Sequence, residues 1–133
     1  MSVKILIVDD SSTMLRILNT AAKMTIIDVE VLEAKNGKEA LEQLENNNDI
    51  KLILLDVNMP VMDGMEFLEI IRTQEKYDHI KVIMQTTETS KKQVEKAIKF
   101  KISGYLMKPY QTKTVKQLMI NLAPVIGYEV KEK

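Results

Sequence analysis

The sequence contains no cysteine, and it has only four glycines and three prolines among 133 residues. The absence of cysteine excludes disulfide scaffolds, thiol catalysis and cysteine-ligated metal sites. The small numbers of glycine and proline exclude collagen-like and low-complexity chains. What is present, 45% hydrophobic and 29% charged residues, is ordinary for one globular domain that buries a sizeable core without cross-links.

Long apolar segments are also absent. No uncharged apolar run approaches the roughly 18 residues that a membrane-spanning helix needs. The N-terminus enters a short apolar stretch that ends in two aspartates, whereas a signal peptide needs a longer apolar region and a small-residue cleavage site. We therefore expect a cytoplasmic protein without membrane insertion.

The net charge is zero, but positive charge is concentrated in one segment. Residues 91–116 hold eight lysines and one acid, a local charge of +7, while the rest of the chain has eleven basic and eighteen acidic residues, a charge of −7. Two interpretations are open for this segment. It forms solvated helix faces, or it forms a surface that attracts an acidic partner.

Short apolar runs alternate with helical patterns along the chain. Four runs have the length and composition of strands buried on both faces, and a fifth, more mixed run suits an edge strand; in chain order they are residues 5–8, 29–34, 52–55, 82–84 and 105–107. A helical apolar pattern follows each of them. The alternation predicts an α/β fold: a doubly wound, five-stranded parallel sheet with five helices on its two faces.

Three positions have the residue types found at helix N-termini. Asp63-x-x-Glu66 and Ser90-x-x-Gln93 resemble capping boxes. Thr112 is a candidate N-cap for the last helix.

The C-terminal end of the chain carries a break signal and a short tail. Pro124 is expected to end or kink the last helix. No linker or second domain is visible, so we assign residues 1–126 to one domain and residues 127–133 to a short charged tail that is expected to fray.

Polar residues stand where the predicted strands end. In a parallel α/β sheet, ligands bind outside the carboxyl ends of the strands. Each of these residues alone has a structural explanation, as a helix cap, a strand residue or a strand exit. Their joint placement at one edge favours a functional site made of three carboxylates, a hydroxyl and an ammonium: Asp9, Asp10, Asp56, Thr86 and Lys108.

The chemistry of these groups points to phosphate and a hard metal ion. Crowded carboxylates repel one another unless a cation joins them. Oxygen ligands select Mg²⁺ or Ca²⁺, and Mg²⁺ is the usual partner of phosphates. A carboxylate can also act as a nucleophile that forms an acyl phosphate, with Mg²⁺ and Lys108 neutralising charge on the transferring group.

Other kinds of site find less support. The four glycines stand far apart, so there is no glycine-rich phosphate loop. His79 is the only histidine, lies before the fourth strand at the opposite edge of the sheet, and is expected at the surface.

With these residues in place, the chain resembles response-regulator receiver domains, and particularly the single-domain chemotaxis members of that family. The resemblance covers about Val3 to Leu122. It implies a flavodoxin-like sheet with the strand order 2-1-3-4-5. Four motifs carry it: Val8-Asp9-Asp10-Ser11-Ser12-Thr13-Met14, Asp56-Val57-Asn58-Met59-Pro60-Val61-Met62-Asp63-Gly64, Thr86, and Lys108-Pro109.

The resemblance assigns a phosphoryl acceptor and a metal site. It implies that Asp56 accepts a phosphoryl group from the phosphohistidine of a histidine kinase. It also implies that Mg²⁺ is bound by the carboxylates of Asp10 and Asp56 and by the backbone carbonyl of Asn58. Asp9 would act mainly through a metal-bound water.

The resemblance also implies a switch. Thr86 would move to hydrogen-bond the new phosphoryl group, and Tyr105 would swing inward as Thr86 moves. Lys108 would pair with a phosphoryl oxygen and precede a cis peptide bond. Asn58 and Glu88 would flank the water that hydrolyses the phosphoryl aspartate.

Some residues depart from the family pattern. Val57 replaces a tryptophan common in the chemotaxis members, and Gln85 stands where an apolar residue is usual. Thr87 replaces a small residue, and its bulk is expected to affect phosphoryl access or the movement of Thr86. Residues 100–104 replace a stretch that is normally small and glycine-containing.

Three functions remain under consideration. The first is a monomeric phosphorylation switch in chemotaxis, not an enzyme acting on an external substrate, whose output is binding to a protein such as a flagellar motor switch component rather than to nucleic acid. The second is the receiver domain of a longer DNA-binding transcriptional regulator. The third, a phosphohydrolase with an aspartyl intermediate, is disfavoured because that class usually has a second aspartate where Asn58 stands.

Overall fold

The computed structural model describes residues 2–87 and 91–131. Its centre is one five-stranded, wholly parallel sheet with the order β2-β1-β3-β4-β5. The strands are β1 (Val3–Val8), β2 (Val29–Ala34), β3 (Ile50–Asp56), β4 (Lys81–Thr86) and β5 (Gly104–Met107). The predicted fold class and strand order are confirmed.

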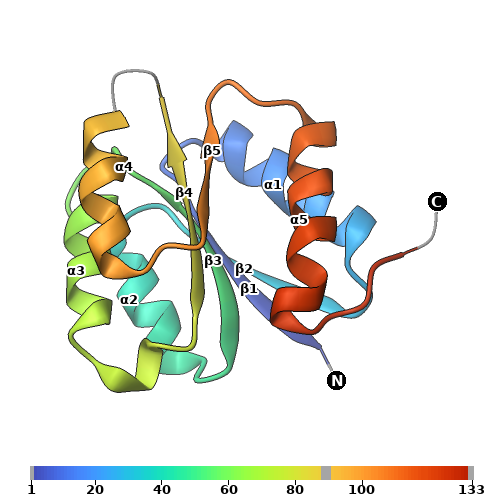
Figure 1. Cartoon of the computed structure of the whole chain (residues 1–133), viewed down its shortest axis with the longest axis horizontal. Coiled ribbons are helices and arrows are strands. Elements are labelled where there is room, and N and C mark those ends of the chain that lie inside the picture. The colour runs from blue at the N-terminus through green and yellow to red at the C-terminus, as the bar shows by residue number, and fades with distance from the viewer. Residues whose placement is uncertain (1, 88–90, 132–133) are drawn as a thin grey trace.

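Helices cover both faces of this sheet (Figure 1). On one face lie α2 (Gly37–Asn46), α3 (Gly64–Arg72) and α4 (Lys91–Ala97), and on the other lie α1 (Ser12–Thr25) and α5 (Thr112–Ile126). Short 3-10 turns, η1 (Glu75–Tyr77) and η3 (Ile98–Phe100), follow α3 and α4. No helix in residues 2–87 and 91–131 is long and apolar enough to cross a membrane.

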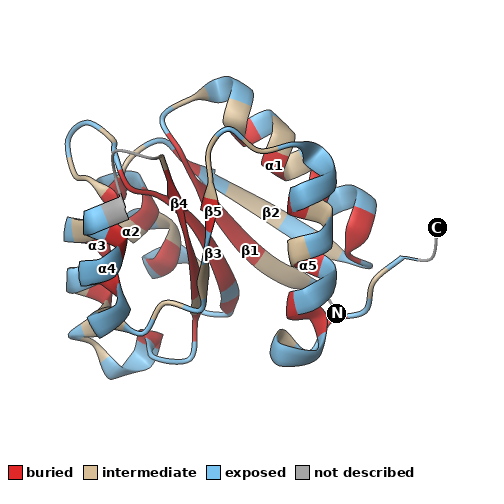
Figure 2. Ribbon diagram, turned by 45° about the horizontal axis from the view of Figure 1, so that its top comes forward, coloured by how far each residue is buried: buried red, intermediate tan, exposed pale blue. Residues whose placement is uncertain are grey.

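The core consists of two apolar layers that the sheet separates. β1, β3 and β4 are almost entirely buried (Figure 2), because helices cover both of their faces. Side chains alternate between the two layers along each strand. In β3, for example, Ile53 packs in the layer of α2, α3 and α4, while Leu52 and Leu54 pack in the layer of α1 and α5. β2 at the edge of the sheet is only partly buried, as its mixed sequence predicts.

One of the three predicted helix starts is confirmed. Asp63 and Glu66 form a reciprocal capping box at the start of α3. Ser90 lies outside the described residues. The prediction for Thr112 is wrong: Thr112 is already the first helical residue, and the preceding Gln111 occupies the cap position without a side-chain hydrogen bond.

The end of the chain also differs from the prediction. α5 continues two residues past Pro124 to Ile126, so the helix does not end at the proline. It ends at Gly127, whose φ of 99° is the left-handed conformation common after a helix. The predicted fraying is wrong for residues 127–131. Tyr128 is buried and its hydroxyl donates to the carbonyl of Met119, and Val130 makes an antiparallel bridge to Ile26. His79 is exposed, as predicted.

Candidate functional site

Three carboxylates meet at the carboxyl ends of β1 and β3. Asp9 follows β1 directly and is fully buried, and Asp56 is the last residue of β3 and is 6% exposed. Asp10 is exposed beside them. The three residues each offer a carboxylate oxygen within 4.8 Å of the others. Since β1 and β3 are neighbours in the sheet, their pairing brings these side chains together.

Lys108 supplies a cation to this cluster. Its Nζ lies 2.9 Å from Asp9 Oδ2 and 3.3 Å from Asp56 Oδ1. It reaches the acids from the segment after β5, where its backbone N–H donates to the carbonyl of Thr86 at 2.6 Å. The Lys108–Pro109 peptide bond is cis, as the resemblance implied.

The surroundings of Asp56 favour its neutral form. Burial, followed by the negative charge of Asp9, raises the pKa of Asp56 from 3.8 to about 6, although Lys108 opposes the shift. Burial also disfavours the charge on Lys108, but its hydrogen bond and attraction to Asp9 raise the pKa of Lys108 overall. Lys108 therefore stays charged, while the acidic cluster holds more negative charge than one lysine neutralises.

The loop after Asp56 is tightly fixed. The N–H of Gly64 donates to the carbonyl of Val57 at 2.9 Å. A Cβ on Gly64 would lie 2.2 Å from the carbonyl oxygen of Asp56, so only glycine allows α3 to start this close to β3. Between them, Asn58 is exposed and Val61 adopts a left-handed φ of 70°. The helix start thus fixes the backbone that carries Asp56.

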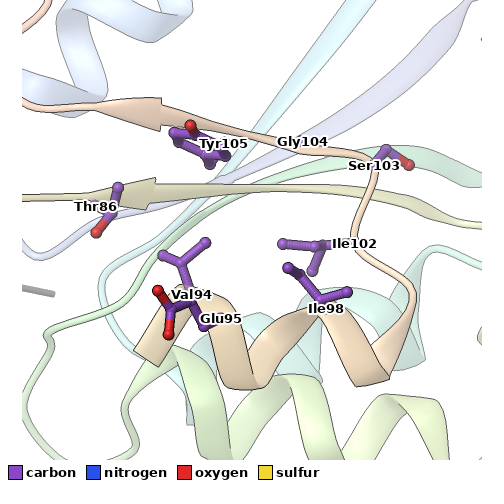
Figure 3. Close-up of a pocket in the computed structure, with 8 residues that line it drawn as sticks. All are labelled: Thr86, Val94, Glu95, Ile98, Ile102, Ser103, Gly104 and Tyr105. Atoms are coloured by element: carbon purple, nitrogen blue, oxygen red, sulfur yellow. The ribbon is translucent and has the colours of Figure 1, made fainter. Parts of the chain in front are cut away.

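Thr86 and Tyr105 face a common pocket. Thr86 is buried and its hydroxyl donates to the carbonyl of Thr87 at 3.0 Å. Tyr105 is 59% exposed. Both line a pocket of about 520 Å³ between β4, β5 and α4 (Figure 3), whose other lining residues are Val94, Glu95, Ile98, Ile102, Ser103 and Gly104.

The lysines of residues 91–116 lie in different environments. Lys108 belongs to the acidic cluster. Five others are exposed on α4, η3, the turn after η3 and the start of α5: Lys92, Lys96, Lys99, Lys101 and Lys113. Lys116, also on α5, is half-buried. The side chain of Lys91 lies outside the described part of the chain.

The structure brings together most of the predicted site residues and adds one that the sequence did not suggest. Asp9, Asp10, Asp56 and Lys108 converge, and Thr86 lies one strand away. Glu88 lies outside the described residues. Tyr110 was missed: its hydroxyl donates at 2.7 Å to Oε1 of Gln85, on the strand next to that of Asp56. The only signals in the sequence were a polar residue in a buried strand and a tyrosine just after Pro109.

Comparisons with known proteins agree on one family. The family model described as "Response regulator receiver domain" matches residues 5–120. The chain is 41% identical over 125 residues to "Chemotaxis protein CheY homolog" of Campylobacter jejuni, covering 93% of this chain and 92% of that relative. It is also 41% identical over 115 residues to "Chemotaxis protein CheY1" of Helicobacter pylori, covering 86% and 91%.

A solved structure extends this agreement to the fold. The chemotaxis response regulator CheY4 of Vibrio cholerae matches with a TM-score of 0.81 and 31% identity, covering 92% of this chain and 99% of that chain. These three relatives therefore have little sequence outside the matched region. The alternative of a longer DNA-binding regulator is not favoured by them.

The raised pKa of Asp56 predicts the pH dependence of stability in EDTA. The folded protein holds this proton more tightly than the unfolded chain, so stability from Asp56 is complete below about pH 4 and is lost as the pH rises through about 6. At neutral pH, Asp56→Asn removes this penalty and should unfold at a higher urea concentration than wild type. The difference should shrink toward pH 4.

The control is Glu69→Gln, which neutralises an exposed acid on α3. We expect its urea midpoint to follow the wild-type pH profile. An Asp56→Asn protein with the same pH profile as wild type would contradict the burial and repulsion assigned to Asp56.

Proposed function

The chain belongs to the response regulator receiver domain family, and we propose that it is a cytoplasmic phosphorylation switch of chemotaxis whose phosphoryl acceptor is Asp56. The donor is the phosphohistidine of a histidine kinase, and the output is a changed affinity for a partner protein. The observation that carries the proposal is the buried Asp56 carboxylate with Lys108 Nζ at 3.3 Å and two further acids beside it.

Phosphoryl transfer uses the Asp56 carboxylate as the nucleophile. A carboxylate oxygen forms a bond to phosphorus while the phosphorus–nitrogen bond of the phosphohistidine breaks, and the electron pair of that bond leaves with the imidazole. Lys108 stands where it can pair with a phosphoryl oxygen. The protein modifies itself in this step and turns over no separate substrate.

The donor set fits Mg²⁺. Carboxylate oxygens are the ligands that this hard cation prefers, and the cluster carries more negative charge than Lys108 neutralises. Both oxygens of Asp9 already accept hydrogen bonds, from the N–H of Ser11 and from Lys108. The family resemblance assigns direct binding of the ion to Asp10, Asp56 and the backbone carbonyl of Asn58. The two occupied oxygens of Asp9 agree with its assigned action through a metal-bound water. When bound, the ion neutralises charge on the phosphoryl group.

Hydrolysis would limit the lifetime of the phosphoryl group on Asp56. The resemblance to the family assigns Asn58 and Glu88 to the water that would attack phosphorus and release the Asp56 carboxylate. Thr86 would then lose its hydrogen bond to the phosphoryl group, and the protein would return to its unphosphorylated conformation. Asn58 stands where phosphohydrolases with an aspartyl intermediate usually have an aspartate that acts as acid and base, so rapid turnover is not expected.

The switch would operate through the pocket between Thr86 and Tyr105. Movement of Thr86 toward the phosphoryl group vacates space on the β4 side of this pocket. The exposed Tyr105 ring can then turn inward and alter the surface of β5 and α4. The exposed lysines on α4, on the turns after it and on α5 make an acidic protein segment the expected partner.

Mg²⁺ should stabilise the fold, because binding to the native state alone adds RT ln(1 + [L]/Kd), about 2.7 kcal/mol at a hundredfold excess over Kd. Wild type should therefore melt at a higher temperature in Mg²⁺ than in EDTA. Asp10→Ala should abolish this response and leave the metal-free protein folded. A Glu42→Ala control, which removes an exposed acid on α2 outside the cluster, should keep the response, and a wild type indifferent to Mg²⁺ would refute the metal site.

Small phosphodonors should label Asp56 alone, and only in Mg²⁺. Mass spectrometry after trapping of the acyl phosphate would locate the label. Asp56→Asn should take none, and label persisting there at the wild-type level would disprove the acceptor assignment. Glu88→Ala should change the decay rate of the label and leave its position unchanged, because Glu88 is assigned to water and not to phosphate.

The phosphorylated form should bind an acidic helical peptide with an association rate that falls with salt, because exposed charges are screened within about 10 Å at 0.1 M ionic strength. Lys92→Glu/Lys96→Glu should slow the association, and Lys35→Glu/Lys38→Glu, which changes two exposed lysines elsewhere, should not. Duplex DNA is the competing ligand. Tight DNA binding that ignores a phosphoryl mimic would overturn the protein-partner assignment.

A further inference from the structure

A hydrogen-bonded polar pair, a buried glutamine and a half-buried tyrosine, lies beside the acidic cluster and has no part in the mechanism described so far. Gln85 is fully buried in β4, in register with Asp56 on β3. Its Oε1 accepts a hydrogen bond of 2.7 Å from the hydroxyl of Tyr110. Its Nε2 lies 3.5 Å from the carbonyl of Val8, the residue before Asp9.

The pair joins the segments that carry the site. Gln85 precedes Thr86, and Tyr110 follows Lys108 by two residues. The Lys108 N–H also donates to the carbonyl of Thr86. The ends of β4 and β5 are thus tied twice, once through the backbone and once through Gln85 and Tyr110.

Stability alone does not require this pair. Successive side chains of a strand point to opposite faces, so Gln85 shares the layer of Ile83, which packs with the apolar residues of α1 and α5. Two apolar side chains of similar shape would fill the same space at nearly equal stability, because the hydrogen bond mainly offsets the cost of burying its own polar groups. Unlike apolar packing, the hydrogen bond between Gln85 and Tyr110 is directional, so it fixes the position of the segment after β5.

The hydroxyl of Tyr110 is held as a donor. Burial, and then the negative charges of Asp9 and Asp56, raise the pKa of Tyr110 well above its usual value. The hydroxyl therefore stays protonated at neutral pH and donates to Gln85.

We propose that Gln85 and Tyr110 are positioning residues for phosphoryl transfer, whose hydrogen bond holds Lys108 at the place where it meets the phosphoryl group on Asp56. The inference rests on the proposed function. Neither residue touches the phosphoryl group; both act through Lys108. A hydrogen bond of ordinary strength corresponds to a rate effect of about three- to tenfold.

The test measures the rate of labelling by acetyl phosphate in Mg²⁺ together with the melting temperature in EDTA. Tyr110→Phe and Gln85→Leu should each slow labelling about three- to tenfold. Gln85→Leu/Tyr110→Phe removes both partners of the hydrogen bond, so its melting temperature should return toward wild type while its labelling stays slow. In a Lys108→Met background, Tyr110→Phe should have no further effect on the rate.

The control is Tyr128→Phe, which removes the hydroxyl of a buried tyrosine far from the acidic cluster in sequence, bonded to the carbonyl of Met119. It should lower the melting temperature and leave the labelling rate unchanged. A double variant that regains both stability and wild-type labelling would show that the pair only fills the core. An effect of Tyr110→Phe that persists in Lys108→Met would also overturn the proposal, whereas a wild type that takes no label would instead refute the phosphoryl acceptor.

Discussion

The repulsion among Asp9, Asp10 and Asp56 is the constraint on which the rest of the site depends. Two of these acids are buried at the end of the sheet, and one lysine lies among them. Burial and the charge of Asp9 raise the pKa of Asp56 to about 6, so ionisation of Asp56 among these acids is electrostatically unfavourable. A bound cation would relieve this repulsion, and a phosphoryl group beside that cation would meet positive charge already in place. The same crowding of carboxylates that lowers the stability of the fold would favour the binding of a cation.

The fold creates this crowding without any special loop. Parallel pairing of β1 with β3 and of β4 with β5 brings four strand ends to one edge, and each contributes a side chain of the site. The approach of Gly64 to the carbonyl of Asp56 then locks α3 against the acceptor strand. The site is therefore rigid on the β3 side. On the β4 and β5 side, the exposed Tyr105 and the pocket beside Thr86 leave room for movement.

The sequence predicted what depends on local patterns and strand ends. Apolar runs located each end of the five strands within two residues, and the Asp63 capping box was confirmed. It did not predict contacts between distant residues, such as Tyr110 with Gln85, 25 positions apart, or the packing of Tyr128 on α5. Such contacts depend on how loops fold back over the core, which neither periodicity nor capping encodes. The exposure of the Tyr105 ring likewise depends on its side-chain conformation, which the sequence pattern does not determine.

The two ties between β4 and β5 explain how a local charge change can reach the surface. Thr86 and Lys108 are both assigned to the phosphoryl group, and the Lys108 N–H is bonded to the carbonyl of Thr86. If Gln85 and Tyr110 hold Lys108 in place, the lysine end of this unit is fixed and Thr86 is the part left to move. Thr86 lines the same pocket as Tyr105, so its movement toward the phosphoryl group would open space in the pocket beside α4 and its lysines. A switch needs one fixed part and one mobile part, and the hydrogen bond between Gln85 and Tyr110 would hold the fixed part in place.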